Sequence, residues 1–280
     1  MKKSAIIVIL ILVLFGVSMV LPITAKASND KSPGIVCTTS ILAHLTEEIA
    51  QELVSVTTIA PAGMCPAHFD IKPSQIKAVR EAKVLISHNF EPWIENLLVS
   101  ADRPEIDRLI LSGPWNTPSG AIAKINQISN TLSEQFPQYK QQFLFNAQKL
   151  IQNINDNAEI LKAKADQLRV KEYKVITSIH QESFAQWLGF EVSATYPAPE
   201  TISTRKFLEL LLIGKREKVA IIIDNLQSGT DLGARLASDL NAQQAILTNF
   251  PGVIPQTESL VKMLNYNAEQ LFKTIGELNP

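Results

Sequence analysis

The sequence lacks a concentration of charge of either sign. It holds 26 lysines and arginines against 27 aspartates and glutamates in 280 residues, for a formal net charge of −1. Proteins that bind duplex nucleic acids contact the phosphates through clustered basic side chains, and no stretch of this chain supplies such a cluster. A nucleic acid partner is therefore not expected. Hydrophobic residues make up 46% of the chain, and with so little net charge that content predicts a folded protein.

The common enzyme motifs are also absent. The chain contains no GxSxG nucleophile turn, no Walker A loop, no GxGxxG after a predicted strand and no HExxH helix. These motifs mark frequent hydrolase, nucleotide-binding and zinc-protease sites. Their absence argues against those classes of enzyme, and we expect a binding protein and not an enzyme.

The N-terminus has the pattern of an export signal. Lys2 and Lys3 precede an unbroken apolar run, Ala5–Leu21, and a small-residue cleavage pattern ends at Ala27. Segments in this order predict a secretory signal peptide over residues 1–27. The run is also just long enough for an uncleaved membrane anchor, and both alternatives place the remainder in the periplasm or on the extracytoplasmic face of the membrane. No cysteine stands at the cleavage point, which argues against a lipid-modified N-terminus.

Short strands alternate with helices on both sides of one long helix. The predicted strands are 35–37, 54–59, 84–87, 108–111, 173–178, 190–196, 219–224 and 245–248. This alternation predicts parallel sheets covered by helices, in an N-terminal lobe over 34–137 and a C-terminal lobe over 171–280. Between them, residues 138–170 place apolar side chains every three or four positions without Gly or Pro, which predicts one helix of about 45 Å. We expect an α/β fold of two parallel-sheet lobes joined by this long rigid helix, with a metal site in the cleft between the lobes.

Three of the four histidines follow predicted strands. His68 lies in the loop after the second strand, His88 follows the third, and His180 follows the first strand of the second lobe, whereas His44 is within a helix. In open parallel sheets ligands bind beyond the carboxyl ends of the strands, and neutral imidazole is a favoured ligand of Zn, Cu, Ni and Fe. The pattern predicts a metal site that draws on both lobes, although each histidine alone also fits a structural role.

Oxygen ligands are available at the ends of the later strands. Asp224, next to Asn225, ends one predicted strand, and Asn249 follows the last one. We expect Asp224 and Asn249 to contribute to the metal site. Asp70 is close to His68 in the sequence, where a hydrogen bond to an imidazole is as good an interpretation as direct ligation.

The chain has two cysteines. Cys37 ends the first predicted strand, and Cys65 lies three residues before His68. In an exported protein such a pair allows one disulfide. Two free buried thiols, and metal ligation by Cys65, are the alternatives.

Several segments together resemble a known family. These segments are CTTSIL at 37–42, APAG at 60–63, PSQI at 73–76, EPW at 91–93 and TNFPG at 248–252. They resemble the zinc and manganese solute receptors of ABC importers, and the resemblance extends over the whole mature chain. It implies two α/β lobes bridged by one long helix, with His68 as a metal ligand. It also implies a membrane permease and its ATPase as partners.

The chain departs from the family pattern at the other expected ligands. Residues 116–120 read NTPSG where the family has a second D-P-H, His180 matches the third ligand only after a shift of one or two positions, and Asn249 stands in place of an aspartate. We interpret His88 as the replacement for the missing second histidine. Three imidazoles and a neutral oxygen carry less negative charge than a manganese site, which favours Zn²⁺ or another late first-row ion over Mn²⁺.

The resulting hypothesis is a monomeric, exported receptor for a divalent transition metal, and two alternatives stay open. A receptor of the same architecture could take a metal chelate or a small organic solute. A secreted metallohydrolase could use His68, His88 and His180 with a water molecule on the metal, and its general base would be Asp70 or Glu182.

Overall fold

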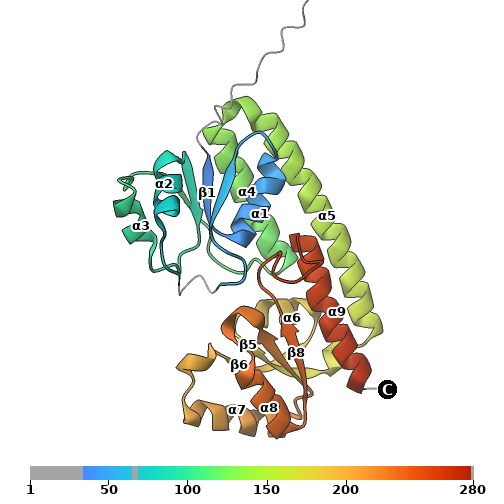
Figure 1. The fold of residues 1–280 in the computed structure, drawn as a ribbon. Helices are drawn as coiled ribbons and strands as arrows, with labels where there is room; N and C mark the ends of the chain where they lie inside the picture. Colours follow the sequence, from blue (N-terminus) through green and yellow to red (C-terminus); the bar gives the residue numbers. More distant parts are fainter. Residues whose placement is uncertain (1–33, 65–68, 279–280) are drawn as a thin grey trace, which may run out of the picture. The chain divides into compact units, whose positions relative to one another are not determined.

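The computed structural model describes residues 34–64 and 69–278. The first sheet in this part of the chain has four strands: β1 (Ile35–Thr39), β2 (Val56–Ala60), β3 (Val84–Ser87) and β4 (Asp107–Ile110). The second also has four: β5 (Lys174–Ser178), β6 (Glu191–Tyr196), β7 (Ile221–Asn225) and β8 (Gln243–Leu247). Their orders are β2-β1-β3-β4 and β6-β5-β7-β8, and all neighbouring strands are parallel. The predicted α/β fold with two parallel sheets is confirmed (Figure 1).

Helices cover both faces of each sheet. Those that follow the strands of the first sheet are α1 (Ser40–Ala50), α2 (Pro73–Glu81), α3 (Ile94–Ser100) and α4 (Pro118–Gln135). Those of the second are α6 (Glu182–Leu188), α7 (Thr204–Glu217), α8 (Asp231–Leu240) and α9 (Leu260–Leu278). Short 3₁₀ turns lie at Pro137–Tyr139, Val170–Glu172, Pro199–Thr201 and Leu226–Ser228. Because both faces are covered, successive side chains of a strand enter different cores: Ile35 and Cys37 pack on the side of α1, and Val36 on the side of α2 and α3.

The long connecting helix is α5 (Lys140–Gln167). Its 28 residues span about 42 Å. Buried side chains recur every three or four positions along it, among them Phe143, Ile154 and Leu161. They pack against α1 and α4 and against α9, so one helix contributes to the core beneath both sheets (Figure 1). The predicted long helix is confirmed.

Helix α4 begins four residues before the helix that apolar spacing predicts at 122–135. Thr117 supplies the reason, because its side-chain oxygen accepts a hydrogen bond from the backbone N–H of Gly120 at 3.2 Å and Pro118 occupies the first turn. The chain between β4 and α4 is therefore a short loop, residues 111–117. It leaves the sheet at the carboxyl end of β4.

None of the helices within residues 34–64 and 69–278 is both long enough and apolar enough to cross a lipid bilayer. The predicted signal peptide or anchor, residues 1–27, lies outside the described residues.

Candidate functional site

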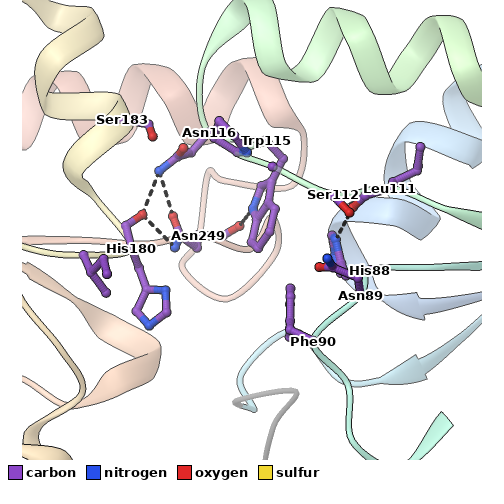
Figure 2. A pocket seen from close by; sticks show the side chains of 13 residues that line it. His88, Asn89, Phe90, Leu111, Ser112, Trp115, Asn116, His180, Ser183 and Asn249 are labelled. Carbon is purple, nitrogen blue, oxygen red and sulfur yellow. Dashed lines mark hydrogen bonds between the residues drawn. The ribbon is translucent and has the colours of Figure 1, made fainter. Parts of the chain in front are cut away.

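A cavity of about 390 Å³ lies where loops from both sheets meet. Its lining residues follow strands of both sheets: 88–90 follow β3, 111–116 follow β4, 179, 180 and 183 follow β5, and 249 follows β8. Figure 2 shows their side chains around the cavity. This is the carboxyl edge of parallel strands, where ligands bind in open α/β sheets. The cavity occupies the place at which the sequence predicts a ligand site.

His88 lies in the wall of the cavity with both ring nitrogens hydrogen-bonded. Nδ1 lies 3.1 Å from the carbonyl oxygen of Leu111, and Nε2 lies 3.0 Å from Oγ1 of Thr39. Because a carbonyl only accepts, Nδ1–H donates to Leu111 and Nε2 accepts from the Thr39 hydroxyl. Burial lowers the pKa of His88 to about 4, against a weaker opposite effect of the Glu91 carboxylate. His88 is thus a neutral imidazole, and ligation by Nε2 requires the Thr39 hydroxyl to move.

An aromatic stack surrounds His88. The His88 ring centroid lies 4.8 Å from that of Phe90 and 4.6 Å from that of Trp115. The Trp115 ring continues to Phe250, at 5.9 Å between centroids. Trp115 Nε1–H donates to the backbone carbonyl of Asn249 at 2.8 Å. The loop after β4 is therefore tied to the loop after β8, which belongs to the other sheet.

Four buried amide side chains, Asn116, Gln181, Asn225 and Asn249, form an amide cluster beside the cavity. Asn116 Nδ2 donates to Asn249 Oδ1 at 3.2 Å and, more weakly, to Gln181 Oε1 at 3.4 Å. Gln181 Nε2 donates to Oδ1 of Asn225 and of Asn249, both at 3.0 Å. Asn249 Oδ1, predicted as a metal ligand, thus accepts two N–H groups. The cluster fastens the loop of the first sheet to two loops of the second.

His180 presents the cavity with an exposed ring. Its backbone carbonyl accepts hydrogen bonds from Asn116 Nδ2 at 3.0 Å and Asn249 Nδ2 at 3.2 Å, which fix the main chain. Its ring nitrogens make no hydrogen bond to another described residue. Figure 2 shows the ring pointing away from these two amides. Partial removal of water lowers the pKa of His180. Its ring is therefore a neutral nitrogen donor that needs no rearrangement to bind a ligand.

Asp224, the other predicted oxygen ligand, lies outside the cavity. It is fully buried, and its carboxylate accepts hydrogen bonds from the Tyr196 hydroxyl and from Gln244 Nε2, both at 2.6 Å. A Cβ atom at Gly233 in α8 would lie 1.8 Å from Oδ2 of Asp224. Burial raises the pKa of Asp224, and the hydrogen bonds oppose this only in part. Its oxygens join β7 to α8 and β8.

The described residues contain no metal-binding cluster of the usual composition. No group of three or more His, Cys, Asp or Glu side chains within residues 34–64 and 69–278 could hold a metal ion. The general-base candidates also lie elsewhere. Asp70 is exposed, Glu182 accepts from Gln186 Nε2 at 3.2 Å, and neither lines the cavity.

The sequence matches the model of a known protein family. The family described as "ZnuA: Zinc-uptake complex component A periplasmic" matches residues 35–274. The chain belongs to this family. The predicted resemblance is thereby confirmed.

The relatives of this ZnuA-family chain are distant in sequence. The metal ABC transporter substrate-binding lipoprotein SloC of Streptococcus mutans is 22% identical over 204 residues, which cover 64% of this chain and 66% of that protein. The zinc-binding lipoprotein AdcA of Streptococcus pneumoniae is 20% identical over all of this chain and 62% of its own length. The chain thus spans just under two thirds of these relatives. The Mn-bound periplasmic metal-binding protein of Candidatus Liberibacter asiaticus has a TM-score of 0.75 at 16% identity, over 86% of this chain and 98% of that one.

Cys65 and His68 of this ZnuA-family chain, for both of which metal ligation is a prediction, lie outside the described residues. Cys37 is described, and it is a free, buried thiol whose Sγ lies 3.5 Å from Oγ1 of Thr46. Burial raises the pKa of this thiol to about 12. Cys37 is therefore an inert core side chain facing α1.

The sequence does not predict the roles of Trp115, in the cavity wall, and of Gln181, beside it. Each precedes or follows a position that the sequence marks, Asn116 or His180, but no local feature distinguishes it. Lys124 carries a local signal, because it stands at a buried position of the apolar face of α4. Its Nζ donates to the carbonyls of residues 112, 113 and 114 at 2.8, 3.0 and 3.2 Å. Lys124 thereby holds the loop that carries Trp115.

Proposed function

We propose that the chain is the extracytoplasmic solute-binding receptor of an ABC importer for a divalent transition metal, with Zn²⁺ as the first candidate and Mn²⁺ as the second. The observation that carries this proposal is the cavity at the carboxyl ends of strands from both sheets, in a chain whose family match covers residues 35–274. Relatives named as zinc-binding and manganese-binding lipoproteins support the metal as the class of cargo. The partners are a membrane permease and its ATPase, and the receptor acts as a monomer.

His180 and His68 are the proposed principal ligands. The free ring of His180 at the cavity supports its assignment. His68 is proposed from its place in the family motif alone. His88 joins them only when Thr39 releases its Nε2, and Asn249 only when Asn116 and Gln181 release its Oδ1. Asp224 contributes through the fold and not as a ligand.

Cargo capture at this site couples occupancy to the arrangement of the two sheets. Ligand groups drawn from both halves favour the state in which the halves are close together. The hydrogen bond from Trp115 to Asn249, and the amide cluster, hold the described structure in such a state. Because α5 is packed into the core of both halves, it limits their movement to a small rotation.

A receptor fits the site better than a metallohydrolase does. Hydrolysis by a metal-bound water needs a general base next to the metal. No carboxylate is among the described residues that line the cavity, and His88 is held by two hydrogen bonds. We therefore propose that the protein binds and releases its cargo without catalysing a reaction.

Radiometal uptake by a strain that lacks the gene tests this function. Uptake of ⁶⁵Zn²⁺ or ⁵⁴Mn²⁺ under metal limitation is expected to fall in the deletion strain and to return with the wild-type gene. His180→Ala is expected to restore at least tenfold less uptake. The matched control is His44→Gln, which removes an imidazole from α1 that does not line the cavity and restores full uptake. Unchanged uptake of both metals in the deletion strain would rule the function out.

A further inference from the structure

The cavity wall is electrically neutral. None of the described residues that line it is Asp, Glu, Lys or Arg, and its two imidazoles have lowered pKa values. Two charges stand directly behind the wall, where Lys124 donates to the carbonyls of residues 112–114 and Glu91 accepts from the His88 backbone N–H. These two are of opposite sign, and they act on the pKa of His88 in opposite directions, Glu91 more strongly than Lys124.

A bare divalent cation is poorly matched to such a wall. Moving a charge out of water is costly unless opposite charges or strong donors replace the water. The neutral oxygen at Asn249 already accepts two N–H groups, and Nε2 of His88 already accepts the Thr39 hydroxyl. Among the described lining residues, the ring of His180 is the nitrogen donor left over. A dication that binds to these described residues has to bring most of its ligands and its negative charge with it.

The cavity also has more room than an ion needs. Its volume of about 390 Å³ is within the range of sites for small organic molecules, roughly 300–1,000 Å³. Phe90 is 44% exposed and Ile179 is 52% exposed, although both side chains line a cavity. The Phe90, His88 and Trp115 rings form a stacked aromatic surface on one side of it. Aromatic surfaces of this kind favour planar partners that stack on them.

We propose that the cargo is a metal complex of a small planar heteroaromatic chelator that carries carboxylate groups. The chelator supplies the negative charge and most donor atoms, and its ring stacks on Phe90 and Trp115. His180 fills a coordination position that the chelator leaves open. This inference rests on the proposed function as a metal receptor, and it specifies the form in which the metal arrives.

Titration calorimetry at neutral pH tests the inference with defined probes. The probes are Zn²⁺ alone, the one-to-one Zn²⁺ complexes of picolinate and of dipicolinate, and each chelator alone. We expect at least one complex to bind at least tenfold more tightly than Zn²⁺ and than its chelator. If neither complex binds more tightly than Zn²⁺, the inference is wrong, whatever the absolute affinities. If a chelator alone binds as tightly as its complex, the cargo is an organic solute and the inference is equally wrong.

Two pairs of variants locate the complex. Phe90→Ala is expected to weaken binding of the complex about three- to tenfold through lost stacking, and Phe145→Ala, at an exposed position of α5, to leave it unchanged. His180→Ala is expected to bring the affinity for the complex down to that for the chelator alone, and His44→Gln is its control. Equal affinities in the members of both pairs would contradict the proposed placement. Failure of this inference can be distinguished from failure of the proposed function, because the radiometal experiment measures uptake of the metal in any form.

Discussion

At the scale of single residues, His88 and His180 differ in what their nitrogens do. The sequence predicts the position of both, since each follows a strand of a parallel sheet. It does not predict that His88 finds Thr39, 49 residues away, as the partner of Nε2. This hydrogen bond depends on the pairing of β1 with β3, which a local pattern does not contain. The same residue type therefore gives a buried structural side chain in one place and a free donor in the other.

His88 makes the stability of the protein depend on pH. Its pKa in the folded protein, about 4, is below the ordinary value of 6.5, so the unfolded chain takes up a proton between these pH values that the folded chain does not. The free energy of unfolding therefore falls as the pH falls from about 6.5 to about 4, by about 3 kcal/mol. Urea unfolding across this range is expected to show the loss in the wild type and a smaller loss in His88→Gln. Parallel pH profiles of the two proteins would show that His88 titrates normally.

At the scale of helices and strands, local sequence patterns predict the positions of most elements. Each predicted strand overlaps an observed one, and the signal is strongest for β1, β3 and β7, which are buried along their whole length. The spacing of apolar residues similarly predicted α5. The spacing of apolar residues did not predict the start of α4, because this start depends on a polar cap at Thr117 and on Pro118, which lie outside the apolar repeat. This shift matters for the site, because it shortens the loop that carries Trp115 and Asn116.

The close approach of α8 to the end of β7 gives a prediction at this scale. A Cβ atom at Gly233 would lie 1.8 Å from Asp224 Oδ2, which is far shorter than a van der Waals contact. Gly233→Ala is expected to cost about 3 kcal/mol of unfolding free energy, since helix and strand must separate. Gly276→Ala in α9 is the control, because a Cβ there meets nothing within 4 Å. It is expected to gain about 0.5–1 kcal/mol from helix propensity. Chemical denaturation measures both, and equal effects would contradict the close contact.

At the scale of the whole described molecule, the two sheets meet through uncharged groups. Trp115 reaches Asn249 across 134 residues of sequence, and Asn116 reaches His180 across 64. The sequence predicts a cleft at this place because the rule about strand ends depends only on topology. It also shows asparagines at positions where the family resemblance implies metal ligands, but it does not predict that Asn116 and Asn249 pair with each other. Their pairing joins loops from different sheets through uncharged side chains.

The missing charge can be restored by a single substitution. In Asn249→Asp a carboxylate oxygen still accepts the N–H groups of Asn116 and Gln181, whereas the second oxygen faces the His180 carbonyl oxygen and replaces that hydrogen bond by a repulsion. One negative charge is added to a neutral wall, and at an effective dielectric constant of about 20 its attraction for a dication at contact amounts to several kcal/mol. We expect the affinity for free Zn²⁺ to rise at least tenfold.

Calorimetry with Zn²⁺ alone measures this change, and Asn153→Asp is the matched control because it adds the same charge at an exposed position of α5. The preference for a zinc complex over free Zn²⁺ is expected to shrink in Asn249→Asp and to persist in Asn153→Asp. If Asn249→Asp binds free Zn²⁺ no better than Asn153→Asp does, charge does not limit capture of the bare ion. The neutral wall would then no longer be a reason to expect a chelated cargo, and the size and aromatic lining of the cavity would have to account for its selectivity alone.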